Sequence, residues 1–98
     1  RWFTILERNL QSKCIDYLKQ EDIYYINVHG SGWGGKGTPD LIVCANGKFV
    51  AFELKVGDNQ LSPAQRIHKK RIKRSGGLHY VPRTLDEFKT ILEGLKWQ

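Results

Sequence analysis

Two acidic residues and a lysine are the side chains of this sequence best placed to do chemistry together. Asp40 stands near the start of one β-branched and aromatic run, and Glu53 and Lys55 stand near the end of the next. Asn46-Gly47 lies between the runs and favours a two-residue type I′ hairpin turn. Continued in register from that turn, the hairpin sets Asp40 opposite Glu53, with Cβ atoms about 4.5–5.5 Å apart. Because side chains alternate along a strand, Lys55 shares the face of Glu53.

Two carboxylates in this position repel each other unless a positive charge neutralises them. Carboxylate oxygens are the ligands that hard divalent cations prefer. The hairpin therefore predicts a divalent-cation site formed by Asp40 and Glu53, next to the ammonium group of Lys55. A salt bridge of these carboxylates with Lys55 and Lys36 is the alternative that needs no metal.

A second feature of the sequence is a concentration of positive charge. Residues 61–83 contain seven Lys or Arg and no Asp or Glu, and the whole chain has a net charge of +6. A block of this kind is typical of proteins that bind a polyanion. The alternative is a solvated helix face without a partner. The cations that we expect to contact nucleic acid are Arg66, Lys69, Lys70, Lys73 and Arg74.

The length and composition fit one small globular domain. The chain has 98 residues, of which 40% are hydrophobic and 27% charged, enough for one modest core and not for two. We expect neither a membrane span nor a signal peptide, because no apolar run has the length or flanks of either. Cys14 and Cys44 lack the spacing of a metal or redox motif, so we expect buried free thiols and a reducing, intracellular setting.

Helices are expected before and after the hairpin. An apolar stripe at helical spacing predicts a first helix over residues 3–20. Ser62 to Gln65 form a capping box with proline at the first helical position, which predicts a second helix that stops at Gly76-Gly77. Thr84 caps a third helix, with Glu87 at the capping-box position. The buried stripe of that helix is expected to comprise Leu85, Phe88, Ile91, Leu92 and Leu95.

Strands are expected where β-branched and aromatic residues gather, over residues 23–28, 38–45, 48–56 and 78–81. Away from its charged end, the hairpin is apolar on both faces. Both faces therefore need cover, which predicts a small mixed sheet between helices. The predicted order is α-β-β-β-α-β-α in a single domain, and the charged end of the hairpin is where a site would open.

The glycine-rich segment before the hairpin matches two nucleotide-binding patterns in sequence. Gly30 to Lys36 nearly fits GxxxxGK, and Gly32 to Gly37 fits GxGxxG. Both patterns require a helix to follow, whereas here a strand is predicted, so we expect no nucleotide cofactor. Lys36 and Trp33 suit contact with a nucleic-acid backbone or an unstacked base instead. A connector without a binding role is the alternative.

With these elements in order, the sequence resembles the VRR-NUC family of the PD-(D/E)XK nuclease superfamily. The segments that carry the resemblance are Glu7-Arg8-Asn9-Leu10-Gln11, Gly37-Thr38-Pro39-Asp40, Phe52-Glu53-Leu54-Lys55 and Leu61-Ser62-Pro63-Ala64-Gln65. The resemblance spans residues 7–65. It implies a restriction-endonuclease-like, three-layer α/β/α fold, with residues 1–98 as one nuclease domain.

The resemblance also implies a metal site with named ligands. Asp40 and Glu53 would bind Mg²⁺ or Mn²⁺, and the backbone carbonyl of Leu54 would complete the protein part of the shell. Glu7 resembles a helix-borne glutamate that binds a second metal or its water. The alternative for Glu7 is an exposed helix residue without a role in the site.

Two further residues are assigned to catalysis by the resemblance. Lys55 would orient the attacking water and stabilise charge on the phosphate. Gln65 would position water, phosphate or Lys55, and a capping role is compatible with this. Related nucleases often carry a tyrosine four residues after that glutamine, whereas this chain has Lys69 preceded by His68. That difference favours direct phosphate contact over recognition of a DNA end.

The implied function is a metal-dependent, structure-selective DNA endonuclease. Compact members of the family act as homodimers on branched DNA, so a four-way junction is the expected substrate. The resemblance further implies a phage or prophage protein in the cytoplasm of a bacterial host. A flap, nick or restriction-like nuclease and a DNA-binding module without catalysis remain the alternatives. Aromatic residues near the chain ends are candidates for the dimer contact: Trp2, Phe3 and Trp97.

Overall fold

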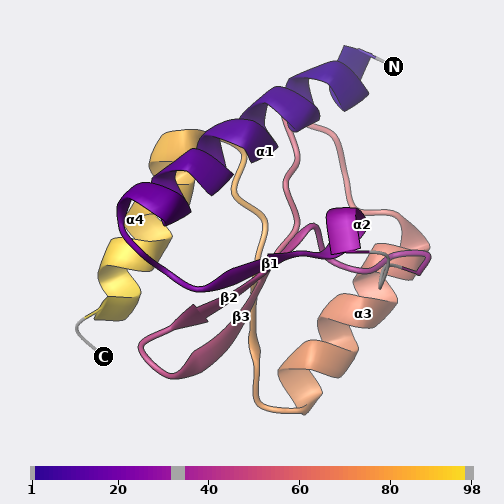
Figure 1. Cartoon of the computed structure of the whole chain (residues 1–98). Helices are drawn as coiled ribbons and strands as arrows, with labels where there is room; N and C mark the ends of the chain where they lie inside the picture. Colours follow the sequence, from indigo (N-terminus) through magenta and orange to yellow (C-terminus); the bar gives the residue numbers. More distant parts are fainter. Residues whose placement is uncertain (1, 32–34, 97–98) are drawn as a thin grey trace.

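A sheet between two helical layers organises the chain (Figure 1). The computed structural model describes residues 2–31 and 35–96. Helices α1 (Trp2–Gln20) and α4 (Leu85–Lys96) cover one face of the sheet, and α3 (Pro63–Arg74) lies on the other. The predicted three-layer α/β/α fold is thereby confirmed. Within the described residues, no helix is long and apolar enough to span a membrane.

Among the residues that the structure describes, the sheet has four strands, and their order in space follows the sequence: β1 (Tyr25–Asn27), β2 (Leu41–Ala45), β3 (Lys48–Phe52) and β4 (Leu78–Tyr80). The first three strands pair antiparallel. β4 pairs parallel with β3, because the chain crosses over through α3 before it returns to the sheet. The sheet is therefore mixed, as the sequence predicts.

The turn of the β2–β3 hairpin has the predicted type. Asn46 and Gly47 have φ angles of 53° and 76°, and a type I′ turn needs a positive φ at both positions. From this turn the ladder runs in the predicted register to the pair formed by Leu41 and Phe52. Asn46 Nδ2 also donates a hydrogen bond to Leu95 O at 3.2 Å, which fastens the turn to α4.

The core lies between the sheet and the layer formed by α1 and α4. The rings of Phe52 and Phe88 meet at its centre, with centroids 4.6 Å apart and planes inclined by 57°. Tyr17 of α1 meets Phe88 edge-on at 6.3 Å, so one aromatic cluster joins both helices to β3. In α4, three residues of the predicted stripe are fully buried, whereas Leu85 and Ile91 are only partly buried.

All four strands are shorter than the sequence indicates, and β4 ends at Tyr80 rather than at residue 81. β1 is limited to Tyr25–Asn27, because Val28 begins a short helix, α2 (Val28–Ser31), where the end of a strand and a loop were expected. β2 begins at Leu41 rather than at residue 38, since Pro39 has no N–H for the ladder. β3 ends at Phe52, and the next backbone N–H, that of Glu53, donates to Tyr80 O at 3.0 Å.

The second face of the sheet is less covered than predicted. α3 packs mainly over β4 and has no buried residue of its own. As a result Phe49 of β3 stays 52% exposed, and the free thiol of Cys44 on β2 is exposed rather than buried. Cys14 on α1 is buried as predicted, and burial raises the pKa of its thiol to about 12.

His79 of β4 should give the fold a distinct pH dependence. Its ring is buried on the face covered by α3, and in the described structure neither ring nitrogen has a hydrogen-bond partner. Burial, together with the charges of Lys69 and Lys73, lowers the pKa of His79 to about 4. The fold therefore holds the neutral ring. The neutral ring contributes fully to the free energy of unfolding above the unfolded-state pKa of about 6.5. This contribution is lost as the pH falls from there towards 4.

We expect wild type to lose about 1–2 kcal/mol more unfolding free energy than His79→Leu when the pH is lowered from 7 to 5. Urea unfolding of both proteins at the two pH values measures this difference, and the variant serves as the control for every other titrating group. Equal losses in the two proteins would show that His79 is not the group responsible.

Candidate active site

Asp40 is held at the start of β2 by the backbone of the neighbouring strand. Its N–H donates to Phe52 O at 3.0 Å, and its Oδ2 accepts a hydrogen bond of 2.7 Å from the N–H of Leu54. Its Oδ1 lies 3.1 Å from Nε2 of His29. Both carboxylate oxygens therefore have fixed directions, one set by the segment that also carries Glu53 and the other by His29.

Glu53 is almost fully buried, with 2% of its surface exposed. Its Oε1 accepts a hydrogen bond of 3.0 Å from Nε2 of Gln65, and its Oε2 is buried and has no partner in the described part of the chain. Burial and the negative charge of Asp40 raise the pKa of Glu53 to about 9, although the charge of Lys55 acts in the opposite direction. The predicted pair of close carboxylates is thus present, with one oxygen left over.

Lys55 is buried on the same segment, with 8% of its surface exposed. The ion pairs that join described residues connect His29 with Asp40, and Lys96 with two glutamates. Neither Lys55 nor Lys36 forms a salt bridge with Asp40 or Glu53 among them. The alternative of a salt bridge from Lys55 or Lys36 to these carboxylates is therefore not found among the described residues.

Gln65 joins the start of α3 to the hairpin. Its N–H donates to Ser62 Oγ at 3.2 Å and its Oε1 accepts from Ser62 N at 2.8 Å, so the predicted capping box is present. Its remaining amide group, Nε2, is the donor to Glu53 Oε1. The capping role of Gln65 is therefore confirmed, and the same side chain also contacts Glu53.

Glu7 of α1 faces the same region. It lines a hollow of about 330 Å³ together with Asp40 and His29; the other lining residues are Thr4, Arg8 and Gln11. The charge of Glu7 contributes to the raised pKa of Glu53. Glu7 Oε2 also accepts a hydrogen bond from Asn59 Nδ2. The structure therefore brings Glu7 towards the two carboxylates rather than leaving it on a remote surface.

Three residues that support the site carried no strong signal in the sequence. His29 contacts Asp40 from the short helix α2. Asn59 donates a hydrogen bond to Glu7. Arg83 fixes the loop that carries Asn59, because its Nη1 donates to the carbonyl oxygens of Gly57 (3.0 Å) and Asn59 (2.7 Å). Arg83 belongs to the basic block by sequence, but its guanidinium is engaged in this loop. Long-range contacts of this kind have no periodicity or spacing by which to find them.

Gly37 stands where the segment before Asp40 passes close to α3. Its φ is +82°, and a Cβ at this position would lie 2.6 Å from the carbonyl carbon of Ala64 in the first turn of α3. Only glycine lets the chain pass so close to α3 on its way to Asp40. Lys36 beside it is exposed. Trp33, the other expected nucleic-acid contact in this segment, lies outside the described residues.

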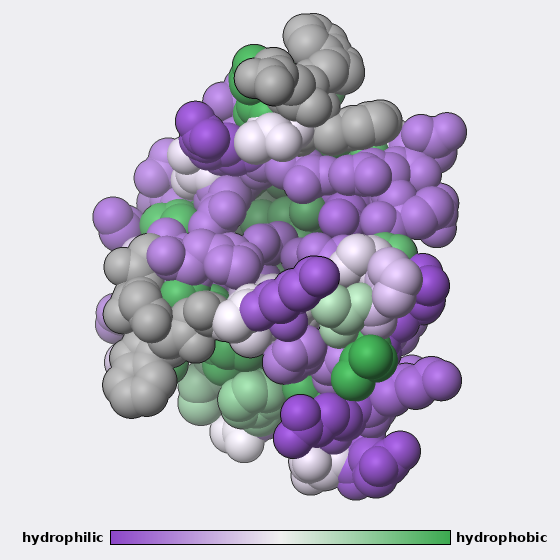
Figure 2. Space-filling view, turned by 90° about the vertical axis from the view of Figure 1, so that its right-hand side faces the viewer, coloured by the Kyte–Doolittle hydropathy of each residue, from purple (hydrophilic) through white to green (hydrophobic). Residues whose placement is uncertain are grey.

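Most of the predicted DNA-binding cations project from α3. Arg66, Lys70, Lys73 and Arg74 are exposed, and Lys69 is half-buried. Arg66 Nη1 donates to Leu61 O at 2.7 Å, so part of its guanidinium is already used. In the side view of Figure 2, hydrophilic residues cover most of the visible face, with small hydrophobic areas between them. The basic helix therefore adjoins the carboxylate site through Gln65 in its first turn.

The donor atoms suit a hard divalent cation. In the described residues, His, Cys, Asp and Glu side chains form no cluster of three or more that would hold a metal by themselves. Asp40 and Glu53 supply two carboxylates, and the buried, unpartnered Oε2 of Glu53 is an oxygen that a cation would satisfy. A small protein share of the ligands is typical of Mg²⁺, which keeps several waters.

Two solved structures share this fold. One, described as a VRR_NUC domain, has a TM-score of 0.73 and 20% sequence identity, covering 89% of this chain and 94% of its own. The other, described as a VRR_NUC domain protein, has a TM-score of 0.71 and 19% identity, covering 91% and 86%. No protein-family model and no curated protein matches the sequence. The comparisons establish the fold and support the resemblance found in the motifs.

We expect Gly37→Ala to destabilise the protein by about 1–3 kcal/mol, because it adds a methyl group against α3 and a side chain at positive φ. Gly35→Ala is the matched control, since a Cβ there meets nothing within 4 Å. Thermal unfolding of the two variants measures the difference. Equal stability of both variants would show that the close approach to Ala64 is not a constraint.

Without metal, we expect Glu53→Gln to stabilise the protein, because the amide keeps the shape of the side chain and removes a buried acid from beside Asp40. A gain of about 1–3 kcal/mol corresponds to roughly 4 °C or more in Tm. Added Mg²⁺ or Mn²⁺ should raise the Tm of wild type and have a much smaller effect on the variant.

The control for this measurement is Asp16→Asn, which removes an exposed carboxylate on α1. It should leave the Tm nearly unchanged in EDTA and preserve the response to the metal. A Glu53→Gln protein that is less stable than wild type in EDTA, or that responds to Mn²⁺ as wild type does, would contradict the assignment.

Proposed function

We propose that this protein is a divalent-metal-dependent DNA endonuclease of the VRR-NUC type. The observation that carries the proposal is the buried carboxylate of Glu53 beside Asp40, with one unpartnered oxygen and with Lys55 on the same segment. The fold shared with two VRR_NUC domains supports it. In this function the chain hydrolyses phosphodiester bonds of DNA.

Asp40 and Glu53 would hold Mg²⁺ or Mn²⁺ through their carboxylate oxygens, with the carbonyl of Leu54 as a further ligand. Glu7 would hold a second ion or its water from the side of α1. When bound, the ion lowers the pKa of a water molecule and offsets negative charge on the scissile phosphate. Protein ligands of this number leave room for water and for the substrate.

The other residues of the site hold these groups in place. Gln65 binds one oxygen of Glu53 and leaves the other free. The N–H of Leu54 and the ring of His29 orient Asp40. Lys55 is the buried cation of the site, and its role is to donate to a phosphate oxygen and stabilise the charge that develops there. Because these side chains stand on a hairpin and a helix start, little rearrangement is needed when the substrate binds.

DNA would lie along α3, whose exposed cations contact phosphates without regard to sequence. The residues assigned to this contact are Lys36, Arg66, Lys69, Lys70, Lys73 and Arg74, with Trp33 as an aromatic contact. Branched DNA, and a four-way junction in particular, is the substrate proposed from the family resemblance. A homodimer would present two active sites to a two-fold junction. The setting that follows is a phage or prophage protein in a bacterial cytoplasm.

Cleavage assays with single variants test this proposal. Asp40→Ala, Glu53→Ala and Lys55→Ala should each lower the cleavage rate by about 100-fold or more, the cost of removing one catalytic group. Lys13→Ala on the exposed side of α1 is the control and should cut like wild type. The substrates are labelled four-way junction, flap, nicked and linear duplex DNA, each with Mg²⁺, Mn²⁺ or EDTA.

Cutting that continues in EDTA, or in the Asp40→Ala protein, would contradict a metal-dependent mechanism. DNA binding without cutting under any condition would favour a catalytically inactive binding module. Efficient cutting of flap, nicked or linear DNA, with the junction left intact, would replace the proposed substrate while leaving the chemistry in place.

A further inference from the structure

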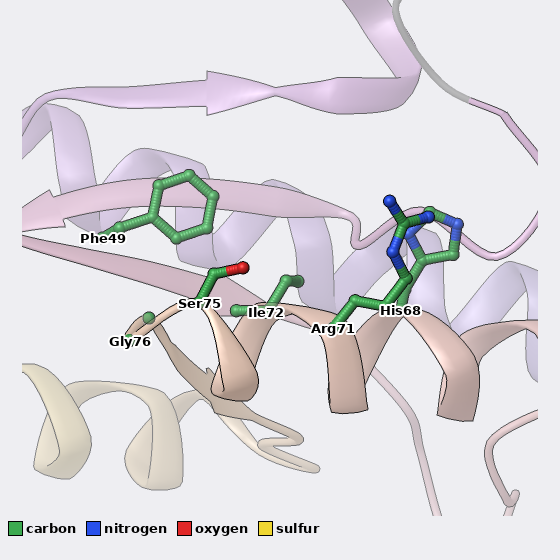
Figure 3. A pocket seen from close by; sticks show the side chains of 7 residues that line it. Phe49, His68, Arg71, Ile72, Ser75 and Gly76 are labelled. Atoms are coloured by element: carbon green, nitrogen blue, oxygen red, sulfur yellow. The ribbon is translucent and has the colours of Figure 1, made fainter.

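An open hollow of about 570 Å³ lies between the start of β3 and the C-terminal half of α3. Its lining consists of Phe49, His68, Arg71, Ile72, Ser75, Gly76 and Gly77. Figure 3 shows the side chains of His68, Arg71 and Ile72 on α3, and of Ser75 directly after it, projecting towards the side on which the Phe49 ring lies. None of the residues assigned to catalysis lines this hollow.

The hollow exists because α3 leans towards β4 and leaves the outer face of β3 open. Phe49 is 52% exposed, although it stands on a central strand. Gly77 lets the ring come close to the chain, since a Cβ there would be 3.1 Å from Phe49 Cδ1 and 3.0 Å from Ile72 Cγ2. The ring is thus supported on one side and accessible on the other.

The chemistry of the lining suits a nucleotide. An exposed aromatic ring is a platform on which a base stacks. The guanidinium of Arg71 and the imidazole of His68 are donors for a phosphate or a base edge, and Ser75 adds a hydroxyl. No Asp or Glu occurs between residues 61 and 83, so the rim of the hollow repels no phosphate.

We propose that this hollow binds an unpaired nucleotide of the DNA substrate, with the base against Phe49 and the phosphate towards Arg71. The proposal rests on the proposed function and specifies the substrate: the strand that is cut has an unstacked base near the cleavage site. Branch points and flaps contain such bases, whereas in an intact duplex a base must first be unpaired and unstacked, which costs a few kcal/mol.

The position of the hollow along α3 sets its distance from the site of cleavage. Gln65 in the first turn contacts Glu53, and Ile72 lies seven residues further along the same helix, or roughly 10 Å. A stacked strand advances by about 3.4 Å per nucleotide. The bound base therefore lies within about three nucleotides of the scissile phosphate.

A second copy of this chain fits the hollow less well. In a two-fold contact the same surface meets itself, so Arg71 and the neighbouring cations of α3 would face their own counterparts. No acidic residue of α3 is present to offset that repulsion. DNA supplies the opposite charge, which is why a nucleotide is the occupant argued here.

The test pairs a change in the protein with a change in the DNA. Wild type and Phe49→Ala are titrated in EDTA with fluorescently labelled four-way junctions and flaps, in which single abasic residues are placed within three nucleotides of the cut. We expect one abasic position, and Phe49→Ala on intact DNA, each to weaken binding about five-fold or more. When both changes are combined, the loss of binding affinity should be no larger than the loss from either change alone.

Phe49→Trp should restore the affinity and Phe49→Leu should not, which separates stacking from simple apolar contact. Tyr24→Ala is the matched control, because Tyr24 is a 71% exposed aromatic residue that does not line the hollow. Circular dichroism of each variant confirms that it is folded.

Phe49 variants that bind and cut DNA as wild type does would overturn this inference and leave the proposed function intact. Strictly additive losses from Phe49→Ala and the abasic position would overturn it as well, and so would a change of oligomeric state in Phe49→Ala during sedimentation. Failure of wild type to bind any of the DNAs would remove the proposed function, and with it this inference.

Discussion

The burial of the Glu53 carboxylate beside Asp40 is the constraint to which the surrounding structure is adapted. A buried acid without compensation costs several kcal/mol, and a second acid nearby adds to that cost. Each neighbouring element supplies part of the compensation. The start of α3 contributes the amide of Gln65, and the segment after β3 contributes the charge of Lys55. One oxygen of Glu53 still has no hydrogen-bond partner in the described structure.

Much of this arrangement follows from local features of the sequence. Asn46-Gly47 determines the turn, the turn determines the register, and the register brings Asp40 next to the segment of Glu53. The capping box at Ser62 determines where α3 begins. These signals are short in range, so they are readable without knowledge of the fold. The layers of helices follow from the apolar faces of the strands.

Other features depend on contacts between distant segments and could not be predicted in this way. The imidazole of His29 reaches Asp40 because Val28 turns into a short helix instead of extending β1. Cys44 and Phe49 lie on an apolar face, yet both are exposed, because α3 packs over β4. A hydrophobic pattern shows which face of a strand needs cover. It does not show how far a single helix of twelve residues will extend over it.

The dual use of Gln65 has a consequence for which amino acids this position tolerates. At the third position of a helix, a capping box functions equally well with glutamate or glutamine. Here the amide nitrogen must donate to a carboxylate while the amide oxygen accepts from Ser62. Glutamate would start the helix but place a third acid against Glu53. Helix capping alone would accept glutamate or glutamine at position 65. The contact with Glu53, twelve positions earlier in the chain, favours glutamine.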